Sequence, residues 1–461
     1  MIWTDFLTSA SRRSEHPAVL GDEGEITYSG LLALVDDVAR TLPRAPEKRP
    51  GRVVLVETEP LALLVQVLAC WSIGLVPVIM REGRNAGSVQ DICDLLSPVA
   101  VIDASGTRLT SSGGVGTSHI DFAARDEALV ICTSGTTQAP KLVALPAESI
   151  LLNARTIGSQ LGLLPGDVVA VVTPLTYMYG LMGGAMSALW SGATIRLFSP
   201  LEPLTVIQAA IRREGITVIQ GPPSLFRLFL AYWNETPFAG VRLVTIGGEF
   251  LDPDLLDRIR RAFPHSDFQL IYGMTEAGPR ISHNCPDAKT VIDGYVGRPF
   301  AHIDWFVEPF EQDGFPSGAG RLVLRGPAMF LGYISQDGGY EGLGCDGYFR
   351  SNDLVRSGPD GGLCFLDRVD RMFKSGGKLL SPLEIETALL QFGPVKEAWC
   401  GKEAHPLLGF VPVAEVVLKK DAATTEQDLH DHCAMSLQQH AIPRRFEFRA
   451  SFAIATSGKR L

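Results

Sequence analysis

The sequence predicts an α/β protein: a large N-terminal domain of parallel βα subdomains with a small β-rich subdomain, followed by a small, mobile α+β C-terminal domain. Short apolar runs alternate with helical patterns over residues 28–271, and such alternation is typical of parallel sheets covered by helices. From about residue 296, short strands with frequent glycines indicate the β-rich subdomain. A charged, hinge-like segment at 367–378 precedes the last elements. Because 461 residues exceed one hydrophobic core, we place the domains at 1–369 and 370–461.

The first elements follow from apolar spacing. Apolar residues at 31, 34, 35, 38 and 42 predict a helix over 28–42. Residues 61–80 carry no charge and are long enough to span a membrane. Gly74 and Pro77 interrupt them, so we expect instead a buried helix and then a buried strand, and no membrane span. The segments expected here are strands at 53–56, 75–80, 99–103 and 128–132, a helix at 61–73 and a mobile surface loop at 105–118.

The pattern continues through the second half of the large domain. A run of small and apolar residues at 180–190 predicts a helix between two strands. Each later strand ends at a glycine or a polar turn, which is where open α/β sheets place their sites. The expected strands are 168–172, 194–198, 217–220, 243–246 and 268–271, then 303–307, 320–324 and 362–366 in the β-rich part.

Charge and cysteine content limit the function classes. The net charge of −10 argues against a nucleic-acid partner, because no basic surplus is available for phosphate backbones. The eight cysteines are scattered without a CxxC pair, which favours reduced thiols in a cytosolic protein. The N-terminus has no signal-peptide pattern, so we expect a cytoplasmic location.

The segment Thr133–Lys141, TSGTTQAPK, is the strongest local signal for chemistry. It follows the predicted strand at 128–132, and its hydroxyls and backbone N–H groups can line a concavity for an anion. Lys141 adds a point charge that suits phosphate. The segment lacks the G-x-x-x-x-G-K-[ST] pattern of the common P-loop. Pro140 disfavours a helix, so we expect extended chain after the loop. An ordinary turn is the alternative interpretation.

Further motifs follow in order at predicted strand ends and turns: Ile246-Gly247-Gly248-Glu249, Tyr272-Gly273-Met274-Thr275-Glu276, Ser351-Asn352-Asp353, Asp367-Arg368-Val369-Asp370, Lys374 with Gly376-Gly377, and Ser457-Gly458-Lys459. With the loop at 133–141, this set resembles the adenylate-forming superfamily of acyl-CoA synthetases, carrier-loading adenylation domains and luciferases. The resemblance covers nearly the whole chain. The phosphate loop and the Y-G-M-T-E motif carry it most specifically.

The resemblance implies the chemistry. A carboxylate attacks the α-phosphate of ATP, giving an acyl-adenylate and pyrophosphate, and a thiol of CoA or of a carrier protein's phosphopantetheine then takes the acyl group. Glu276, beside Thr275, would help to hold Mg²⁺, a cation that prefers oxygen ligands. Lys459 would neutralise charge that develops between the carboxylate and the α-phosphate. The residues that would bind the β- and γ-phosphates are Thr133, Ser134, Gly135, Thr136, Thr137 and Lys141.

The same resemblance assigns the nucleoside contacts and the hinge. Asp353 would accept hydrogen bonds from the ribose hydroxyls, and Arg368 would support the ribose or phosphate region. Asp370 matches the hinge about which the small C-terminal lid domain rotates. Glycines let a flat ring approach the backbone, and the residues expected around adenine are Gly247, Gly248, Glu249, Tyr272, Gly273 and Met274. Ordinary turns and surface ion pairs are the alternatives for these positions.

The acid substrate is expected to be apolar or aromatic. Residues 174–180 correspond to a P-x-x-H-x-x-G turn of the family, with Tyr177 at the histidine position, and no aspartate is present there to pair an α-amino group. Core packing is the alternative role for these side chains. The residues expected in the acid pocket are Tyr177, Met178, Tyr179, Gly248 and Met274.

The sequence also departs from the family pattern. Gln138 and Leu142 replace residues that are often glycine, Asn352 replaces a glycine, and only two residues follow Lys459. The leading hypothesis is an acid–CoA ligase. Transfer to a carrier-protein thiol or another nucleophile, and a nucleotide-binding homologue with impaired catalysis, stay as alternatives.

The substitution Lys459→Ala tests the lysine assignment. Loss of this charge should slow adenylation about 10²–10³-fold, as expected when one group that stabilises developing charge is removed. Thioester formation from pre-formed acyl-adenylate should proceed at the wild-type rate. Acyl-adenylate formation at an unchanged rate would show that the assignment is wrong.

Overall fold

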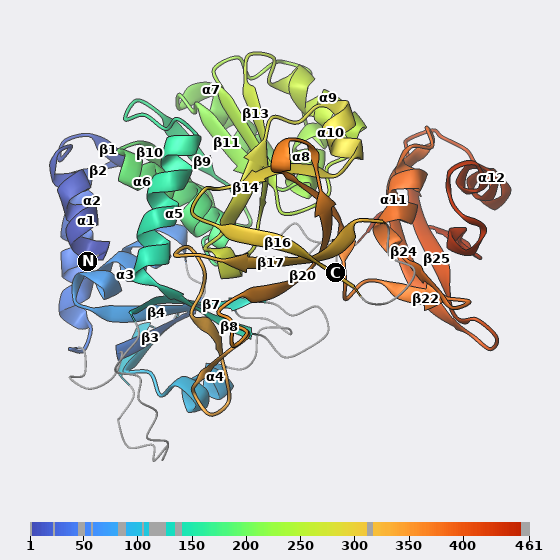
Figure 1. Ribbon diagram of the computed structural model, residues 1–461. Coiled ribbons are helices and arrows are strands. Elements are labelled where there is room, and N and C mark those ends of the chain that lie inside the picture. Colours follow the sequence, from blue (N-terminus) through green and yellow to red (C-terminus); the bar gives the residue numbers. More distant parts are fainter. Residues whose placement is uncertain are drawn as a thin grey trace. The chain divides into compact units, whose positions relative to one another are not determined.

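The computed structural model describes residues 2–21, 24–44, 51–56, 59–81, 89–103, 106–109, 126–133, 141–310 and 317–452. Figure 1 labels the helices and strands along the chain. By its internal contacts, the chain divides into two compact units. Unit 1 comprises Met1–Gly248, Ile259–Ile281 and Gly326–Gly347, and unit 2 comprises Glu249–Arg258, Ser282–Arg325 and Tyr348–Leu461. The predicted α/β class is confirmed. The domain boundary expected at residue 370 stays a prediction.

Unit 1 contains an eight-stranded sheet in the order β19-β18-β8-β7-β4-β3-β5-β6. Strands β5, β3, β4 and β7 are parallel neighbours, whereas β8 pairs antiparallel with both β7 and β18. The predicted helix and strand within 61–80 are confirmed as α3 and β4. The elements are β3 (Gly51–Val56), α3 (Pro60–Ser72), β4 (Leu75–Met80), α4 (Val89–Leu96), β5 (Ala100–Asp103), β6 (Gly106–Leu109), β7 (Glu127–Thr133), β8 (Lys141–Pro146), β18 (Gly332–Ile334) and β19 (Tyr340–Glu341).

One expectation for this sheet is wrong. Residues 106–109, expected to belong to a surface loop, form strand β6, which pairs antiparallel with β5 from Asp103↔Gly106 to Ala100↔Leu109. Gly106 takes φ +113°, a conformation that L side chains rarely adopt, and so permits the tight reversal. The remainder of the expected loop that follows Leu109 lies outside the described residues.

Seven further strands of unit 1 belong to a 13-stranded sheet and follow the order β2-β1-β10-β9-β11-β12-β13 within it. All described pairs among these seven strands are parallel except the β1–β2 hairpin. The strands are β1 (Pro17–Gly21), β2 (Gly24–Thr27), β9 (Val168–Val171), β10 (Thr194–Leu197), β11 (Val218–Gly221), β12 (Leu243–Gly247) and β13 (Asp267–Gly273). The helices are α1 (Ile2–Ser11), α2 (Tyr28–Thr41), α5 (Ala147–Gln160), α6 (Ser187–Ser191), α7 (Leu204–Arg213) and α8 (Pro223–Ala231).

The helix predicted over 180–190 forms in two parts. Residues Tyr179–Met186 are a π-helix (η2), which continues into α6. In its satisfied orientation the Gln220 amide donates to the Gly183 carbonyl and accepts from the Gly184 N–H, both at 3.2 Å. A Cβ on Gly184 would lie 1.9 Å from the end of the Gln220 side-chain amide. The glycine pair therefore admits a side chain into the helix backbone, a common cause of π geometry at functional sites.

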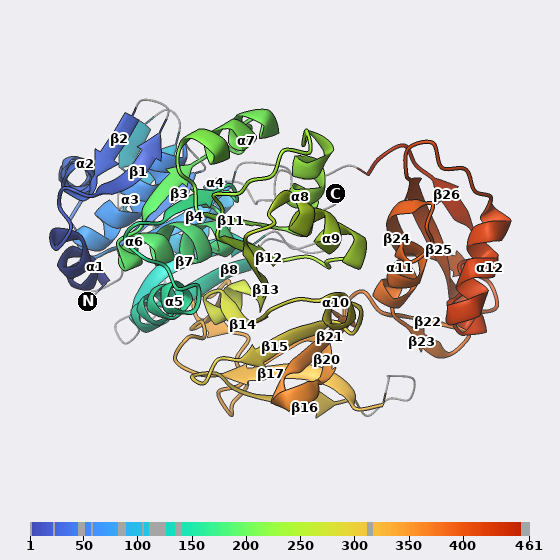
Figure 2. The ribbon, with the colours of Figure 1, turned by 90° about the horizontal axis from the view of Figure 1, so that it is seen from above.

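Unit 2 contains an antiparallel array in the order β16-β17-β20-β21-β15, whose strands lie side by side in Figure 2. Helix α9 (Pro253–Ala262) and strand β14 (Arg280–Asn284) contain residues of both units. The other elements are η3 (Thr275–Ala277) in unit 1, and α10 (Ala288–Ile292), β15 (Tyr295–Pro299), β16 (Asp304–Pro309), β17 (Ala319–Arg325), η4 (Pro359–Gly361), β20 (Phe349–Ser357) and β21 (Leu363–Arg368) in unit 2.

The C-terminal residues of unit 2 form a sheet in the order β23-β22-β25-β24, with β26 paired to β25. Its apolar core draws on residues from Phe373 to Phe446, which agrees with an α+β body for this part of the chain. The elements are β22 (Phe373–Ser375), β23 (Lys378–Leu380), α11 (Pro382–Leu390), β24 (Val395–His405), β25 (Gly409–Leu418), α12 (Glu426–Ser436), η5 (Gln439–Ala441) and β26 (Phe446–Phe448). Across the described ranges, no helix has the length and apolarity to cross a membrane.

A buried ion pair crosses the eight-stranded sheet. Arg52 on β3 donates from Nε and Nη2 to the two carboxylate oxygens of Glu127 on β7, at 2.8 and 2.9 Å. The hydroxyl of Tyr340 on β19 donates to the same carboxylate at 2.5 Å. Burial lowers the pKa of Arg52, but the hydrogen bond and charge of Glu127 outweigh burial and raise it. Three strands that are far apart in sequence are thus tied through one carboxylate.

Glu127→Ala should lower the free energy of unfolding by about 3–5 kcal/mol, because it leaves the Arg52 guanidinium buried without its counter-charge. Urea unfolding followed by tryptophan fluorescence measures the change. The double variant Arg52→Met/Glu127→Leu should recover most of the loss, because it removes both charges. As a control, Asp37→Ala breaks the exposed pair with Arg40 and should cost less than about 1 kcal/mol. Equal costs for Glu127→Ala and Asp37→Ala would contradict the role assigned to the buried pair.

Candidate active site

The predicted phosphate loop begins and ends on a β-hairpin. Thr133 closes β7 and Lys141 opens β8, where the two residues are register partners, and the Thr133 hydroxyl donates to the Lys141 carbonyl at 3.2 Å. Extended chain after Pro140 is therefore confirmed. The expected phosphate ligands between these ends, Ser134, Gly135, Thr136 and Thr137, lie outside the described residues, as do Gln138 and Lys459.

Tyr333 links the loop's lysine to the predicted magnesium ligand. Its hydroxyl donates to Glu276 Oε1 at 2.6 Å, and Lys141 Nζ lies 4.5 Å from the centre of its ring. Strand β18 carries Tyr333 and pairs with β8 at Tyr333↔Val143, two residues beyond Lys141. The Phe330 N–H also donates to the Glu276 carbonyl at 2.8 Å. The sequence analysis missed Tyr333, because an aromatic residue in a three-residue strand matches none of the motifs.

The glycines expected near adenine lie at one edge of the parallel sheet. Gly247 ends β12 beside Ile271 of β13, and a Cβ on Gly247 would lie 2.7 Å from the Ile271 carbonyl oxygen. Gly248 takes φ +89°, so it permits the chain to turn directly after the strand. Tyr272 and Gly273 end the neighbouring strand. The carboxyl ends of β12 and β13 therefore bring the two motifs together, as expected for a ligand edge.

Thr275 and Glu276 lie in the short helix η3 that follows β13. The Met274 N–H donates to the Pro279 carbonyl at 2.9 Å, which closes the chain over this helix. A Cβ on Gly273 would lie 2.0 Å from that carbonyl oxygen, so the closure requires glycine there. The Glu276 carboxylate is thus held between a tight turn and the Tyr333 hydroxyl. Carboxylate oxygen is the donor type that Mg²⁺ prefers, so the chemistry of this residue fits that ion.

The three residues at 177–179 that are expected in the acid pocket have different surroundings. The Arg81 guanidinium donates to the Tyr177 hydroxyl and lies 5.2 Å from the ring centre. Met178 is buried. Tyr179 opens the π-helix, and its hydroxyl donates to the Thr245 carbonyl on β12 at 3.2 Å. Burial raises the pKa of Tyr179, so the phenol stays protonated at neutral pH. Sequence reasoning missed Arg81, which directly follows the charge-free run at 61–80.

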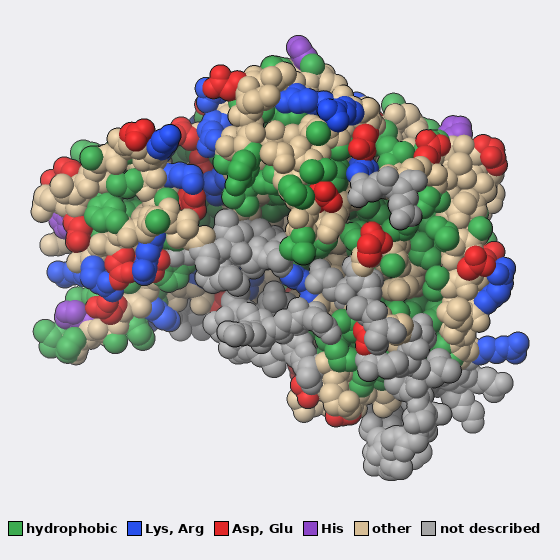
Figure 3. Space-filling model, turned by 180° about the vertical axis from the view of Figure 1, so that it is seen from behind, with side chains coloured by type: hydrophobic (Ala, Val, Ile, Leu, Met, Phe, Trp, Pro, Cys, Tyr) green, Lys and Arg blue, Asp and Glu red, His purple; other side chains and the backbone are tan. Residues whose placement is uncertain are grey.

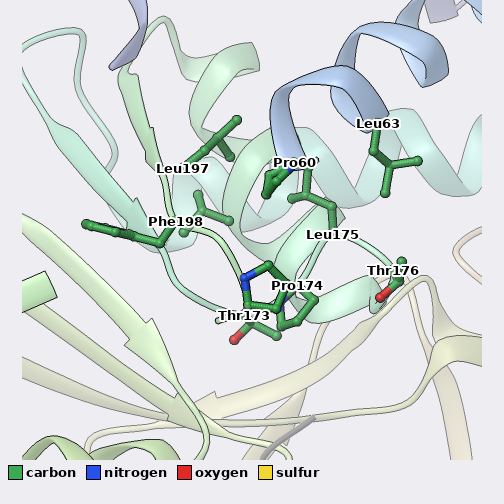
Figure 4. A pocket seen from close by; sticks show the side chains of 10 residues that line it. Pro60, Leu63, Thr173, Pro174, Leu175, Thr176, Leu197 and Phe198 are labelled. Atoms are coloured by element: carbon green, nitrogen blue, oxygen red, sulfur yellow. The ribbon is translucent and has the colours of Figure 1, made fainter. Parts of the chain in front are cut away.

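An apolar recess lies just before these tyrosines (Figure 4). Pro174, Leu175 and Thr176 form one side of it, with Pro60 and Leu63 of α3 and Phe198 after β10 around the others. Its volume of about 10 Å³ is close to the minimum needed for a single water molecule. This recess is too small to receive a carboxylic acid of the expected kind.

The residues assigned to the ribose and the hinge meet in unit 2. Asp353 on β20 and Arg368 on β21 are register partners, and Arg368 Nη1 lies 3.8 Å from Asp353 Oδ1. Arg368 also donates from Nε and Nη2 to Asp370, at 2.9 and 2.8 Å. Burial raises the pKa of Asp370, but the bonds from Arg368 outweigh it and lower that pKa. Glu249 belongs to unit 2 as well.

The surface agrees with the mixed composition of the chain. On the face that Figure 3 shows, acidic and basic side chains are interspersed among hydrophobic and uncharged ones. No single acidic tract is visible among the described residues on this face.

Together, the parallel strands, the hairpin at the predicted phosphate loop and the ordered motifs match the pattern of an α/β protein of the adenylate-forming type. The family model of the AMP-binding enzyme matches residues 6–334, and that of the AMP-binding enzyme C-terminal domain matches residues 384–459. The chain belongs to the AMP-binding enzyme family. The resemblance inferred from the motifs is confirmed.

Similar proteins include the 2-succinylbenzoate–CoA ligase of Bacillus subtilis (strain 168), 24% identical over 449 residues that cover 94% of this chain and 91% of that protein. The oxalate–CoA ligase of Arabidopsis thaliana is 26% identical over 343 residues, 72% of this chain and 66% of the relative. For the first four curated relatives, the chain spans 55–66% of their length.

Solved structures share the fold across the whole chain. ATP-bound MatB from Rhodopseudomonas palustris has a TM-score of 0.85 at 21% identity, covering 100% of this chain and 97% of the other. The anthranilate CoA ligase AuaEII, in complex with anthranoyl-AMP, has a TM-score of 0.84 at 19% identity, covering 100% and 95%. At these identities the similarity establishes the fold.

Tyr333→Phe should raise the Mg²⁺ concentration that half-saturates ATP binding about tenfold, because it removes the hydroxyl that orients Glu276. The phenylalanine ring stays beside Lys141. Calorimetric titration of ATP at increasing Mg²⁺ concentrations measures the half-saturating Mg²⁺ concentration. Tyr340→Phe is the matched control, because its hydroxyl binds the buried Glu127 instead. That control should lower stability and leave the Mg²⁺ dependence unchanged. An identical Mg²⁺ dependence in Tyr333→Phe and the wild type would contradict the assignment.

Proposed function

We propose that the protein activates a carboxylic acid with ATP and transfers the acyl group to CoA. The acid's carboxylate oxygen attacks the α-phosphorus, and the bond to pyrophosphate breaks, giving acyl-adenylate and pyrophosphate. The sulfur of CoA then attacks the acyl carbon, AMP leaves and the thiol proton passes to solvent. The observation that carries this proposal is the Lys141–Tyr333–Glu276 arrangement, which holds a cation and a carboxylate beside the base of the predicted phosphate loop.

The roles of individual residues follow from the site. Lys141 and the hydroxyls of the loop at 133–137 would bind the β- and γ-phosphates, and Glu276 would hold Mg²⁺, which neutralises phosphate charge when bound. Gly248 and Tyr272 would flank adenine at the strand edge. Asp353 would bind the ribose, with its position maintained by the neighbouring Arg368.

The second half-reaction would require the small domain to turn. We place the hinge at Asp370 and the lid at 370–461, as the sequence predicts. The bidentate contact between Arg368 and Asp370 would be broken or remade in that rotation. Lys459 would neutralise the developing charge in the lid orientation used for adenylation. It would move away from the site in the orientation used for thioester formation.

The acid is proposed to have an apolar or aromatic body. Support comes from the buried Met178 and from Tyr179, whose phenol is fixed against β12. Relatives are named as ligases of oxalate, 2-succinylbenzoate, sulfoacetate and medium-chain acyl groups, so their names do not select one acid.

CoA is favoured as the acceptor because these relatives are named as CoA ligases. A carrier-protein thiol or another nucleophile is the alternative for the second step. A nucleotide-binding homologue with impaired catalysis is the alternative for the first, and the off-pattern Gln138 and Asn352 motivate it.

A panel of carboxylic acids in a pyrophosphate-release assay tests the proposal. Aryl and medium-sized organic acids should support release that requires both ATP and Mg²⁺, and added CoA should convert the adenylate to a thioester detected by mass spectrometry. Turnover with amino acids alone would exclude the proposed substrate class. Absence of ATP-dependent hydroxamate formation with every acid would favour the impaired homologue.

A further inference from the structure

Arg280 is a buried arginine whose guanidinium has no hydrogen-bond partner in the part of the chain that the structure describes. It is the first residue of β14, only 1% of its surface is exposed to solvent, and it is among the largest fully buried side chains. None of its three guanidinium nitrogens has a hydrogen-bond partner within the described ranges. Burying an unpaired guanidinium is costly, because its water is lost and nothing replaces it. Such a group calls for an explanation in a native structure.

The other buried arginines of unit 1 have protein partners. Arg52 binds both carboxylate oxygens of Glu127, and Arg196 donates to Glu214 at 2.7 Å and to the Leu197 carbonyl at 2.6 Å. The fold therefore provides a counter-charge for an arginine that has a structural role. Arg280 differs from both in this respect.

Among the described residues, the groups recorded beside Arg280 are not anions. Its Nη2 lies 3.8 Å from the position that a Cβ on Gly183 would take, so the guanidinium lies against the π-helix. The Tyr179 phenol acts on its charge, but that hydroxyl already donates to Thr245. The Gln220 amide is used by the backbone of Gly183 and Gly184. Burial lowers the pKa of Arg280 to about 10, so the side chain stays charged at neutral pH.

The location of Arg280 coincides with the proposed acid pocket. Tyr179 belongs to that pocket, and the Met274–Pro279 hydrogen bond of 2.9 Å holds Met274 beside the residue that precedes Arg280. Gly183 contributes no side chain, and a Cβ there would lie 3.0 Å from the Tyr179 ring. The glycine therefore lets the π-helix backbone lie close to both the Tyr179 ring and the Arg280 guanidinium.

We propose that Arg280 binds a second anionic group of the acid substrate, a carboxylate or sulfonate remote from the carboxylate that is adenylated. This inference rests on the proposed function, because it assigns the substrate class of the same site. A guanidinium matches such a group with two parallel hydrogen bonds. The apolar or aromatic body of the acid would lie against Tyr179 and Met178. The second anionic group of the substrate would be the counter-charge of the Arg280 guanidinium.

Matched pairs of acids test the proposal. The probes are the dicarboxylates from malonate to adipate and the three phthalate isomers, each compared with its monomethyl ester in the pyrophosphate-release assay. For the best diacid, kcat/KM of the wild type should exceed that of the ester about 100-fold or more, as expected when a site built to bind a polar group meets an analogue without it. Arg280→Gln should lower kcat/KM for the diacid by a similar factor and leave the ester within threefold.

Arg196→Gln is the matched control, because it removes a buried arginine that has its own carboxylate. It should leave the ratio of diacid to ester unchanged. A wild-type preference for esters or simple monoacids, or an equal loss for diacid and ester in Arg280→Gln, would overturn the proposal.

Thermal melting separates this inference from the proposed function. Isophthalate and glutarate should raise the wild-type melting temperature more than their monomethyl esters do, and this difference should vanish in Arg280→Gln, whether or not any acid is adenylated. Arg280→Met without ligand should melt no lower than the wild type, because it removes an unpaired buried charge. Equal effects of diacid and ester on the wild type, or a destabilised Arg280→Met, would contradict an anion-binding role even if adenylation occurs.

Discussion

The pairing of β18 with β8 is the constraint on which the candidate site depends. It brings Tyr333 beside a hairpin that lies about 190 residues earlier in the chain, with Tyr333↔Val143 as register partners. Because side chains on a strand alternate between faces, a shift of one residue would turn the Tyr333 hydroxyl away from Glu276. The pairing of β18 with β8 thus places Tyr333 between the Lys141 cation and the Glu276 carboxylate, which are far apart in sequence.

Two buried arginines of unit 1, Arg52 and Arg280, differ in their partners. The Arg52–Glu127–Tyr340 group is satisfied internally and ties β3, β7 and β19 across the sheet. Arg280 has equivalent burial and no such partner in the described part of the chain. Proteins commonly accept lower stability where a ligand is to supply an interaction, and satisfied charges elsewhere offset this cost. The contrast between the two arginines supports the binding role that we propose for Arg280.

Glycines shape the same region by making room. Gly184 admits the Gln220 amide into the π-helix, Gly247 lets β12 lie against β13, and Gly273 allows the chain to close over Glu276. In each case a Cβ would lie within 3 Å of a neighbouring atom. The strand edge that carries the nucleotide motifs and the helix that carries Tyr179 are therefore packed more closely than side chains would permit.

The sequence by itself determined the α/β class, most strands of the parallel sheets and the membership of the family, because apolar periodicity and ordered turn motifs are local properties. It also placed Glu276 and Arg368 at a turn after a strand and at a strand end, where the structure has them. The turn expected at Asp353 is wrong, because Asp353 lies in the middle of β20, paired with Arg368 of β21. Only the tertiary structure decided that Tyr333 bridges Lys141 and Glu276 and that residues 179–186 form a π-helix. It also decided that Arg280 is buried with no hydrogen-bond partner among the described residues. These features arise from contacts between segments far apart in the chain, and no local pattern of residue types encodes which distant side chain will be paired.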